Sequence, residues 1–297
     1  MRLLLVAILA VVQGAAEMLP VSSSAHVIIV EKLLGLDPTT PEMTFLLVML
    51  HTGTMVAVLV YYWARWGRLL SRSNAHRWDF VKMLVIATVA TGIVGLALQY
   101  LIETIVLGGK RGAAVENVFG NLWIIAPALA LVGALIMIAG FWQRSHANSP
   151  SEEGSPAGAP PGRLAWTSLL IGIVQGLALP FRGFSRSGST ISTGLLAGLD
   201  RRLAEELSFA LAVILTIPVV GREALRLRHA IPAAGHVFSS LPVLTGIIGM
   251  AFSFAAGLAA LRWLSAWLEK SRWGFFGVYC VVFSVLILVL MGTGAIT

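Results

Sequence analysis

Ionisable residues are scarce in this 297-residue chain. Asp, Glu, Lys and Arg together make up 12% of it, whereas about a quarter of the residues of a typical soluble domain are charged. Hydrophobic residues make up 57%, and the mean hydropathy is +0.86. This shortage of charge excludes an ordinary soluble domain and predicts an integral membrane protein.

Cysteine is almost absent, and acidic residues are outnumbered by basic ones. The single cysteine, Cys280, lies within an apolar run, so no disulfide can form within the chain. The formal charge is +7, but the basic residues fall between apolar runs and form no aromatic-laced cluster. We therefore expect no nucleic-acid partner, and membrane topology explains the basic residues better.

The apolar residues gather into runs that approach the length needed to cross a bilayer. A helix needs roughly 20 mostly apolar residues to span about 30 Å of hydrocarbon. Six continuous runs are close to this length: 43–63, 80–98, 121–142, 207–220, 241–264 and 274–291. The sequence therefore predicts an all-α polytopic membrane protein whose outer surface contacts membrane lipids.

The chain repeats one order of features on either side of a linker. Residues 143–163 are rich in Pro, Gly and Ser and lack a hydrophobic period, which predicts a flexible cytoplasmic linker. The tripeptide Val-Gln-Gly occurs at 12–14 and again at 174–176, and each copy leads to a Leu-Pro pair, at 19–20 and 179–180. The shared order of elements favours an internal repeat over chance.

A polar run interrupts each copy directly after its proline. The runs read VSSSAH and FRGFSRSGSTIST, and short apolar pieces follow them at 27–36 and 191–199. These pieces are too short to cross a bilayer, and non-helical backbone is tolerated at membrane depth only inside protein or beside a wet cavity. The pattern predicts two re-entrant helical hairpins, at about 3–36 and 164–199.

Three predicted spans follow each hairpin, and because three is odd the second copy must enter the membrane from the opposite face. We therefore expect two inverted repeats, 1–142 and 164–297, whose hairpin tips meet near the bilayer midplane. Basic residues indicate the orientation: 12 of them fall on the side of the loop that begins at Arg65, and 7 fall on the other side. This bias predicts a cytoplasmic loop and a first hairpin that enters from outside.

The first predicted tip carries a carboxylate, hydroxyls and an imidazole. Gln13 and Glu17 are four residues apart, so a helix presents both on one face. A carboxylate at the centre of a spanning helix costs about 2.5 to 3.5 kcal/mol, so Glu17 needs either an arginine partner or a wet cavity. Ser22, Ser23, Ser24 and His26 follow it. The serines are possible nucleophiles and the histidine a possible acid, or else the hydroxyls serve helix packing and the histidine is a hydrogen-bonded core residue.

The second predicted tip supplies positive charge and small residues. Arg182 and Arg186 place guanidinium groups at membrane depth, and Gly183 and Gly188 allow the backbone close to a ligand. Hydroxyl groups beside a helix start add donors that suit phosphate: Ser185, Ser187 and Thr190. An anion cradle, a carboxylate and a nucleophile are what phosphoryl transfer with a divalent cation requires, and the apolar surroundings predict a lipid phosphate or diphosphate as substrate.

Through QGAAEMLPVSSSAH and RGFSRSGST the chain resembles the bacterial undecaprenyl-diphosphate phosphatase family, also known as bacitracin-resistance proteins. The likeness covers essentially the whole chain. It implies hydrolysis of undecaprenyl diphosphate to undecaprenyl phosphate and phosphate, which recycles the lipid carrier of cell-wall synthesis. It also implies a divalent cation, Mg²⁺ or Ca²⁺, and a multi-pass protein of the bacterial inner membrane whose site opens to the periplasmic side. Bacitracin would act by sequestering the substrate. The sequence allows a homo-oligomer as well as a monomer.

The resemblance also implies roles for individual residues. Glu17, with Gln13, would bind the metal, or Glu17 would act as base. Ser23 and His26 are rival candidates for the nucleophile and the acid–base partner, and a metal-bound water is a third. The diphosphate would be held by Arg186, Ser185, Ser187 and Thr190. From their positions at the two tips, we expect four further residues to contact the substrate: Ser22, Arg182, Gly183 and Gly188.

Two departures from the family pattern are visible. Gln13 is an allowed alternative that removes a charge from the metal site. Arg182 stands where the motif has proline, and the segment 175–183 is one residue longer than the common form. The second departure adds a cation at the rim of the predicted site.

Other functions and other residues stay in competition with this interpretation. Acid-phosphatase-like lipid phosphatases carry a histidine six residues after the motif arginine, and Ser192 occupies that position here, which disfavours them. A transporter or flippase of polyprenyl phosphate would share inverted repeats and broken helices. His51, Thr52 and Thr54 interrupt a span and either line the cavity or serve helix packing.

Overall fold

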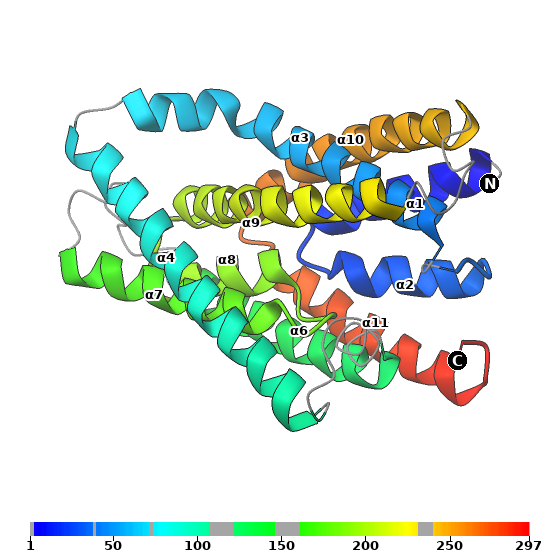
Figure 1. The fold of residues 1–297 in the computed structure, drawn as a ribbon. Helices are drawn as coiled ribbons and strands as arrows, with labels where there is room; N and C mark the ends of the chain where they lie inside the picture. Colours follow the sequence, from blue (N-terminus) through cyan, green and yellow to red (C-terminus); the bar gives the residue numbers. More distant parts are fainter. Residues whose placement is uncertain are drawn as a thin grey trace.

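The described residues of the computed structural model, 3–37, 40–71, 74–106, 108, 121–145, 161–230 and 240–296, fold into helices without a strand. The first half contains α1 (Leu3–Met18), α2 (Ser23–Leu33), α3 (Pro41–Ser71), α4 (Asn74–Leu101), the π-helical turn η1 (Ile102–Val106) and α6 (Leu122–Ser145). The second half contains α7 (Pro161–Ala178), α8 (Arg186–Leu196), α9 (Arg201–Ala230), α10 (Ser240–Glu269) and α11 (Gly274–Gly292). Figure 1 shows α1 beside α10 and α4 beside α7.

Five of the described helices are long and apolar enough to cross a membrane: Glu42–Ser71, Arg77–Ile105, Leu122–Ser145, Val243–Glu269 and Gly274–Gly292. Large apolar side chains on their outer faces are exposed, as a lipid-facing surface requires, among them Val89 on α4 and Val282 on α11. The prediction of a multi-pass helical membrane protein is therefore confirmed for these five spans.

The sixth predicted span, 207–220, lies within α9, which is a continuous helix but is not one of the five. At 1.5 Å of rise per residue this apolar stretch is only about 21 Å long, shorter than the hydrocarbon core. The sixth span therefore stays a prediction.

The two short helix pairs, α1 with α2 and α7 with α8, are each broken at the predicted Leu-Pro pair. The second helix of each pair begins earlier than predicted, at Ser23 instead of 27 and at Arg186 instead of 191. The reason is capping: the hydroxyls of Ser22 and Ser185 accept hydrogen bonds from the first-turn amides, at 3.4 and 3.2 Å. The motif residues therefore stand on the first turns of two helices.

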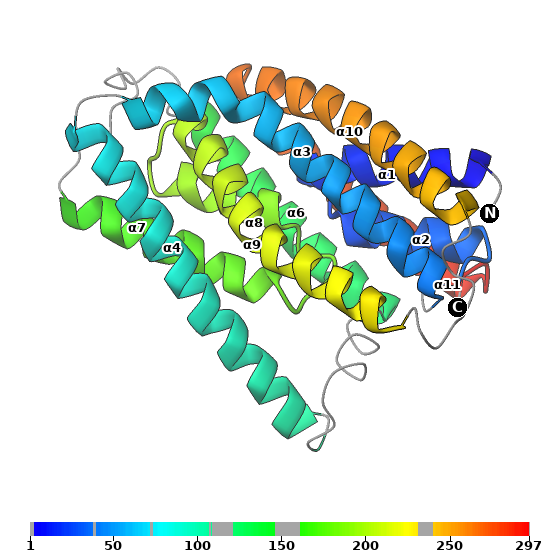
Figure 2. The ribbon, with the colours of Figure 1, turned by 45° about the horizontal axis from the view of Figure 1, so that its top comes forward.

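The first helix of each pair packs on a long helix of the other half. A Cβ placed on Gly14 would lie 2.5 Å from the carbonyl oxygen of Ser253, so α1 and α10 are in backbone contact. Gly176, which occupies the same place in the second Val-Gln-Gly, lies equally close to α4, because its Cβ would stand 2.7 Å from that of Val94. Figure 2 shows the same neighbours from a second direction. The repeated glycine therefore has the same packing role in both halves.

The linker predicted over 143–163 is shorter than expected. Helix α6 continues to Ser145 and α7 begins at Pro161, so three residues at each end are helical. Proline is accepted in a first helical turn because its missing amide hydrogen would have had no intrahelical partner there. The remainder, 146–160, lies outside the described residues.

A buried polar cluster joins α3, α9 and α10 away from the two broken pairs. The hydroxyl of Tyr62 donates to Oε1 of Glu205 at 2.5 Å, and the hydroxyl of Ser265 donates to the same oxygen. Tyr61 in turn donates to Ser265 at 2.9 Å, and the guanidinium of Arg65 stands over the Tyr61 ring at 5.1 Å. Because Glu205 is 2% exposed, its carboxylate depends on these donors.

Replacing Tyr62 by phenylalanine should lower the free energy of unfolding by about 1 to 3 kcal/mol, because a buried carboxylate oxygen then loses a donor. The midpoint of thermal unfolding in detergent measures the loss. Tyr100→Phe is the matched control, since Tyr100 is 69% exposed on α4, and its midpoint should not change. Equal midpoints for Tyr62→Phe and the unmutated protein would contradict a stabilising role of the cluster.

Candidate active site

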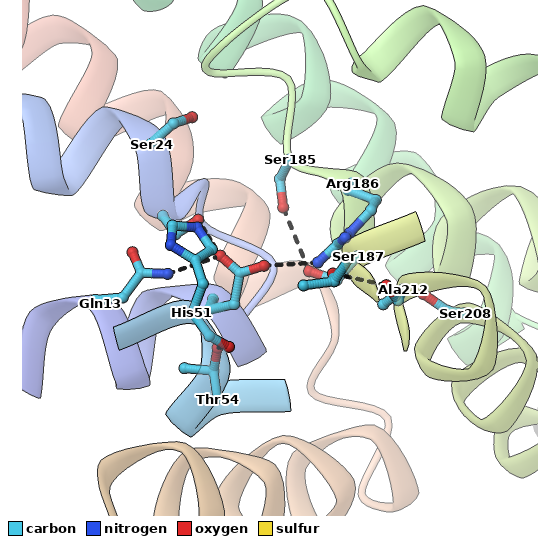
Figure 3. Close-up of polar contacts among 12 residues, drawn as sticks. Gln13, Ser24, His51, Thr54, Ser185, Arg186, Ser187, Ser208 and Ala212 are labelled. Carbon is cyan, nitrogen blue, oxygen red and sulfur yellow. Dashed lines mark hydrogen bonds and ion pairs between the residues drawn. The ribbon is translucent and has the colours of Figure 1, made fainter. Parts of the chain in front are cut away.

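An ion pair joins the two broken helix pairs. Nη2 of Arg186, on the first turn of α8, lies 2.6 Å from Oε1 of Glu17 near the end of α1. The side chains are 24% and 12% exposed, so water screens the pair only partly. The predicted arginine partner of the buried carboxylate is thus present, and it comes from the opposite half of the chain (Figure 3).

The other oxygen of Glu17 accepts two hydrogen bonds from its own half. Ser23 Oγ donates to Oε2 at 2.5 Å, and Nε2 of Gln13 donates to the same atom at 3.2 Å. A short bond from a hydroxyl to a carboxylate is the geometry of a nucleophile beside a general base. Glu17 therefore stands between a hydroxyl that it can deprotonate and a guanidinium that can bind an anion.

His26 faces another helix. Its Nδ1 donates to the carbonyl oxygen of Ser22 at 2.8 Å, and its Nε2 accepts from the hydroxyl of Tyr279 at 2.7 Å. The ring stacks on Phe283 of α11, with 4.1 Å between ring centroids. Of the two rival nucleophiles, the structure places Ser23 on Glu17, whereas His26 holds the start of α2 against α11.

The hydroxyls of the second motif bond mainly to the protein itself. Ser185 caps α8, and its Oγ lies 3.5 Å from that of Ser187, which donates to the carbonyl oxygen of Leu19 at 3.3 Å. Thr190 donates to the carbonyl oxygen of Arg186 at 2.8 Å and lies 2.6 Å from the hydroxyl of Ser208 on α9. Ser185 and Ser187 stay near the guanidinium, as Figure 3 shows, while Thr190 fastens α8 to α9.

The two motif glycines pack closely against α6. Gly183 has φ +102°, and a Cβ on it would lie 2.5 Å from the carbonyl oxygen of Ile125 on α6. A Cβ on Gly188 would lie 2.8 Å from Cδ1 of Ile136, also on α6. The sequence indicated small residues correctly, but the surface that they approach is α6.

A small cavity borders the ion pair. Its charged part is Glu17 and Arg186, and most of its walls come from α3 and α9. Most wall residues are apolar, including Met55, Val58, Phe209 and Val213. An apolar wall directly beside a charged pair suits a molecule that joins a phosphate to a hydrocarbon chain.

Comparison with known proteins agrees with this geometry. The model of the family described as bacitracin resistance protein BacA matches residues 6–286. The chain belongs to the BacA family. Similar proteins include undecaprenyl-diphosphatase 2 of Acinetobacter baylyi, 49% identical over 98% of both chains. Undecaprenyl-diphosphatase 1 of Frankia alni is 32% identical over 97% of this chain and 96% of its own. The resemblance carried by the two motifs is therefore confirmed.

Arg182, the departure from the BacA pattern, faces a second carboxylate. Its positive charge acts on Glu31 of α2. Glu31 is 5% exposed, and its Oε1 has no hydrogen-bond partner within the described residues. As with Glu17 and Arg186, the acid comes from the first broken pair and the arginine from the second. The extra cation at the rim thus comes with a buried acid that the sequence did not single out.

His51 is the residue whose contribution to this site the sequence left open. It lies on α3, and Figure 3 shows its ring beside the amide of Gln13, which donates to Glu17. Nδ1 donates to the carbonyl oxygen of Leu47 at 2.9 Å, which orients the ring. The only sequence signal was a polar interruption of a span, and Thr54, in the same interruption, lines the cavity.

The residues fit a divalent cation that arrives with its substrate. Within the described residues, no three His, Cys, Asp or Glu side chains form a metal-binding group. Glu17 accepts three hydrogen bonds, and because a carboxylate offers about four lone-pair positions, one remains for a cation. The side chain of Gln13 adds an amide oxygen. Magnesium is commonly held by one or two carboxylates together with substrate phosphates and water. This donor set matches that arrangement.

Proposed function

We propose that this chain hydrolyses undecaprenyl diphosphate to undecaprenyl phosphate and inorganic phosphate in the bacterial membrane. The observation that carries the proposal is the position of Glu17, with the Ser23 hydroxyl on one oxygen and the Arg186 guanidinium on the other. The relatives, undecaprenyl-diphosphatases that match nearly the whole chain, support the same activity. The chain is a phosphoric anhydride hydrolase.

The geometry favours Ser23 as the attacking group. Its oxygen attacks the terminal phosphorus while its proton passes to Glu17, and the bond between that phosphorus and the bridging oxygen breaks. The lipid monophosphate leaves and takes up the proton from Glu17. A water molecule then attacks the phosphoserine while Glu17 takes one of its protons, the bond between phosphorus and the Ser23 oxygen breaks, and Glu17 returns that proton to the Ser23 oxygen. Arg186 neutralises the oxygens that gain charge in both steps, which is the main requirement of phosphoryl transfer.

The proposal also assigns roles to a cation and to the residues around the pair of Glu17 and Arg186. Gln13 and Glu17 would hold a divalent cation, Mg²⁺ or Ca²⁺, which supplies charge neutralisation on the phosphate oxygens. Ser185 and Ser187 stand beside Arg186 and would contact the same phosphate. Arg182 would contact the second phosphate at the rim. The polyprenyl chain would lie against the apolar wall formed by α3 and α9.

Inverted repeats with re-entrant hairpins, and a site open to the periplasmic side, also belong to the proposal. The equivalent packing of α1 on α10 and of α7 on α4, through Gly14 and Gly176, supports a two-fold relation between the halves. The short lengths of α1 and α2 support a hairpin that does not cross the bilayer. The excess of basic residues on one side supports the orientation.

Release of inorganic phosphate from undecaprenyl diphosphate by the purified protein in detergent tests the activity. We expect release that depends on added divalent cation and stops with a chelator. A preparation that binds the lipid but releases no phosphate under any cation would refute the hydrolase.

A second candidate function is movement of polyprenyl phosphate across the membrane, because two broken helix pairs packed on opposite halves are also transporter architecture. Counterflow of labelled lipid phosphate in vesicles measures it. Counterflow without phosphate release would favour the transporter, and phosphate release without counterflow would favour the hydrolase alone.

A further inference from the structure

His51 presents an unused nitrogen to the site. Because Nδ1 carries the hydrogen that bonds the Leu47 carbonyl oxygen at 2.9 Å, the neutral ring keeps a lone pair on Nε2. The described residues give Nε2 no hydrogen-bond partner, and the ring is half-buried. The other histidine near the site differs, since both nitrogens of His26 are engaged.

The His51 ring lies near the two residues that are proposed to hold the cation, Gln13 and Glu17. Figure 3 shows it beside the Gln13 amide, which donates to the Glu17 carboxylate at 3.2 Å. These three side chains come from α1 and from the facing α3, which pack together. A metal-binding histidine usually donates its other ring N–H to a carbonyl oxygen or carboxylate, which fixes the tautomer and orients the ring, and the bond from Nδ1 of His51 to the Leu47 carbonyl oxygen is of this kind.

We propose that Nε2 of His51 is a third protein ligand of the divalent cation, together with Glu17 and the amide oxygen of Gln13. The inference rests on the proposed function only for the presence of a cation. Its consequence concerns cation choice: Ca²⁺ and Mg²⁺ take oxygen ligands, whereas first-row transition metals bind mixed nitrogen and oxygen sets with affinities that rise from Mn²⁺ to Cu²⁺. A nitrogen in the set therefore raises the affinity for Mn²⁺ relative to Ca²⁺ and Mg²⁺. His51→Gln, which restores an all-oxygen set, lowers that relative affinity.

Pulsed electron paramagnetic resonance of bound Mn²⁺ tests the ligand directly. The probe is Mn²⁺ with methylenediphosphonate, a diphosphate analogue that cannot be hydrolysed, added to the full chain in detergent. We expect modulation from a directly coordinated ¹⁴N nucleus, and its replacement by the ¹⁵N pattern after labelling with ¹⁵N-histidine. His51→Ala and His51→Gln should lose the nitrogen signal, while His26→Gln should keep it. Mn²⁺ affinity should fall on the order of tenfold or more in His51→Ala.

The outcomes separate this inference from the proposed function. Bound Mn²⁺ without nitrogen modulation in the unmutated protein, or the same modulation in folded His51→Gln, would overturn the assignment, and so would absence of Mn²⁺ binding. The ¹⁵N-labelled unmutated protein decides the question even if both variants fail to fold. Histidine modulation without phosphate release would refute the hydrolase and leave the cation ligand standing, and phosphate release without the modulation would do the reverse.

Discussion

Replacing Ser23 by alanine should lower kcat for undecaprenyl diphosphate hydrolysis by roughly 10⁴-fold or more, the loss expected when an enzyme loses its nucleophile. The reason is the 2.5 Å hydrogen bond from its hydroxyl to Glu17, which the neighbouring hydroxyls lack. Steady-state phosphate release measures the loss. Acid quenching during turnover, followed by mass spectrometry of the peptide that contains Ser23, should detect a phosphoserine in the unmutated protein and none in the variant.

Ser24→Ala is the matched control for this prediction. Ser24 is the next residue on the same helix, but its hydroxyl lies 3.3 Å from that of Ser22 instead of reaching Glu17. Its loss should change kcat by less than about tenfold, a cost of under about 1.4 kcal/mol in the barrier. If Ser23→Ala kept more than about a hundredth of the activity, attack by serine would be refuted, and a water molecule activated by Glu17 would take its place.

Arg186→Ala should lower kcat/KM by about 10³- to 10⁵-fold, the range measured for arginines that neutralise a transferring phosphoryl group. Nη2 of Arg186 is the cationic group in contact with Glu17, and its loss removes charge at the position where the phosphate would bind. Arg186→Lys should recover only part of the activity, because an ammonium group lacks the planar guanidinium geometry that donates hydrogen bonds to two phosphate oxygens at once. The readout is again steady-state phosphate release, with both kinetic constants resolved.

One further variant and one further measurement make the arginine result interpretable. Arg202→Ala removes an arginine whose side chain is 71% exposed and pairs with Glu269 at the surface, and its activity should not change. Arg186→Ala also leaves Glu17 without its cation, so the midpoint of thermal unfolding of this variant shows whether a stranded charge unfolds the protein. Arg186→Ala with an unchanged midpoint and unchanged kcat/KM would refute a role of Arg186 in phosphate binding.

The sequence predicted most of the site because its chemistry is unusual for a membrane. A carboxylate within an apolar run needs a partner or a wet cavity, so the sequence singled out Glu17 and offered an arginine of the second motif as one of the two possibilities. The two broken segments were visible because Pro20 and Pro180 cannot continue a helix. The glycines of the second motif were also identified, although their neighbour, α6, was not.

The choice between Ser23 and His26 could not be made from the sequence. Both stand within the first turn of α2, and which one faces Glu17 depends on the backbone of Ser22, whose φ is +67°. A left-handed conformation at a residue other than glycine is rare and is not indicated by a serine. Likewise, His51 reaches the site because α3 packs on α1, and the position of one helix beside another is not encoded in local periodicity.

The pairing of Glu17 with Arg186 also constrains how the protein is made. The ribosome synthesises the acid 169 residues before the arginine, so the pair α1 and α2 is made while its cation does not yet exist. An ionised carboxylate is costly in hydrocarbon, and the protonated form is the one that hydrocarbon admits. The pair α1 and α2 therefore has to stay neutral or shallow during translation, and it can settle beside α8 and α10 only when nearly the whole polypeptide has left the ribosome.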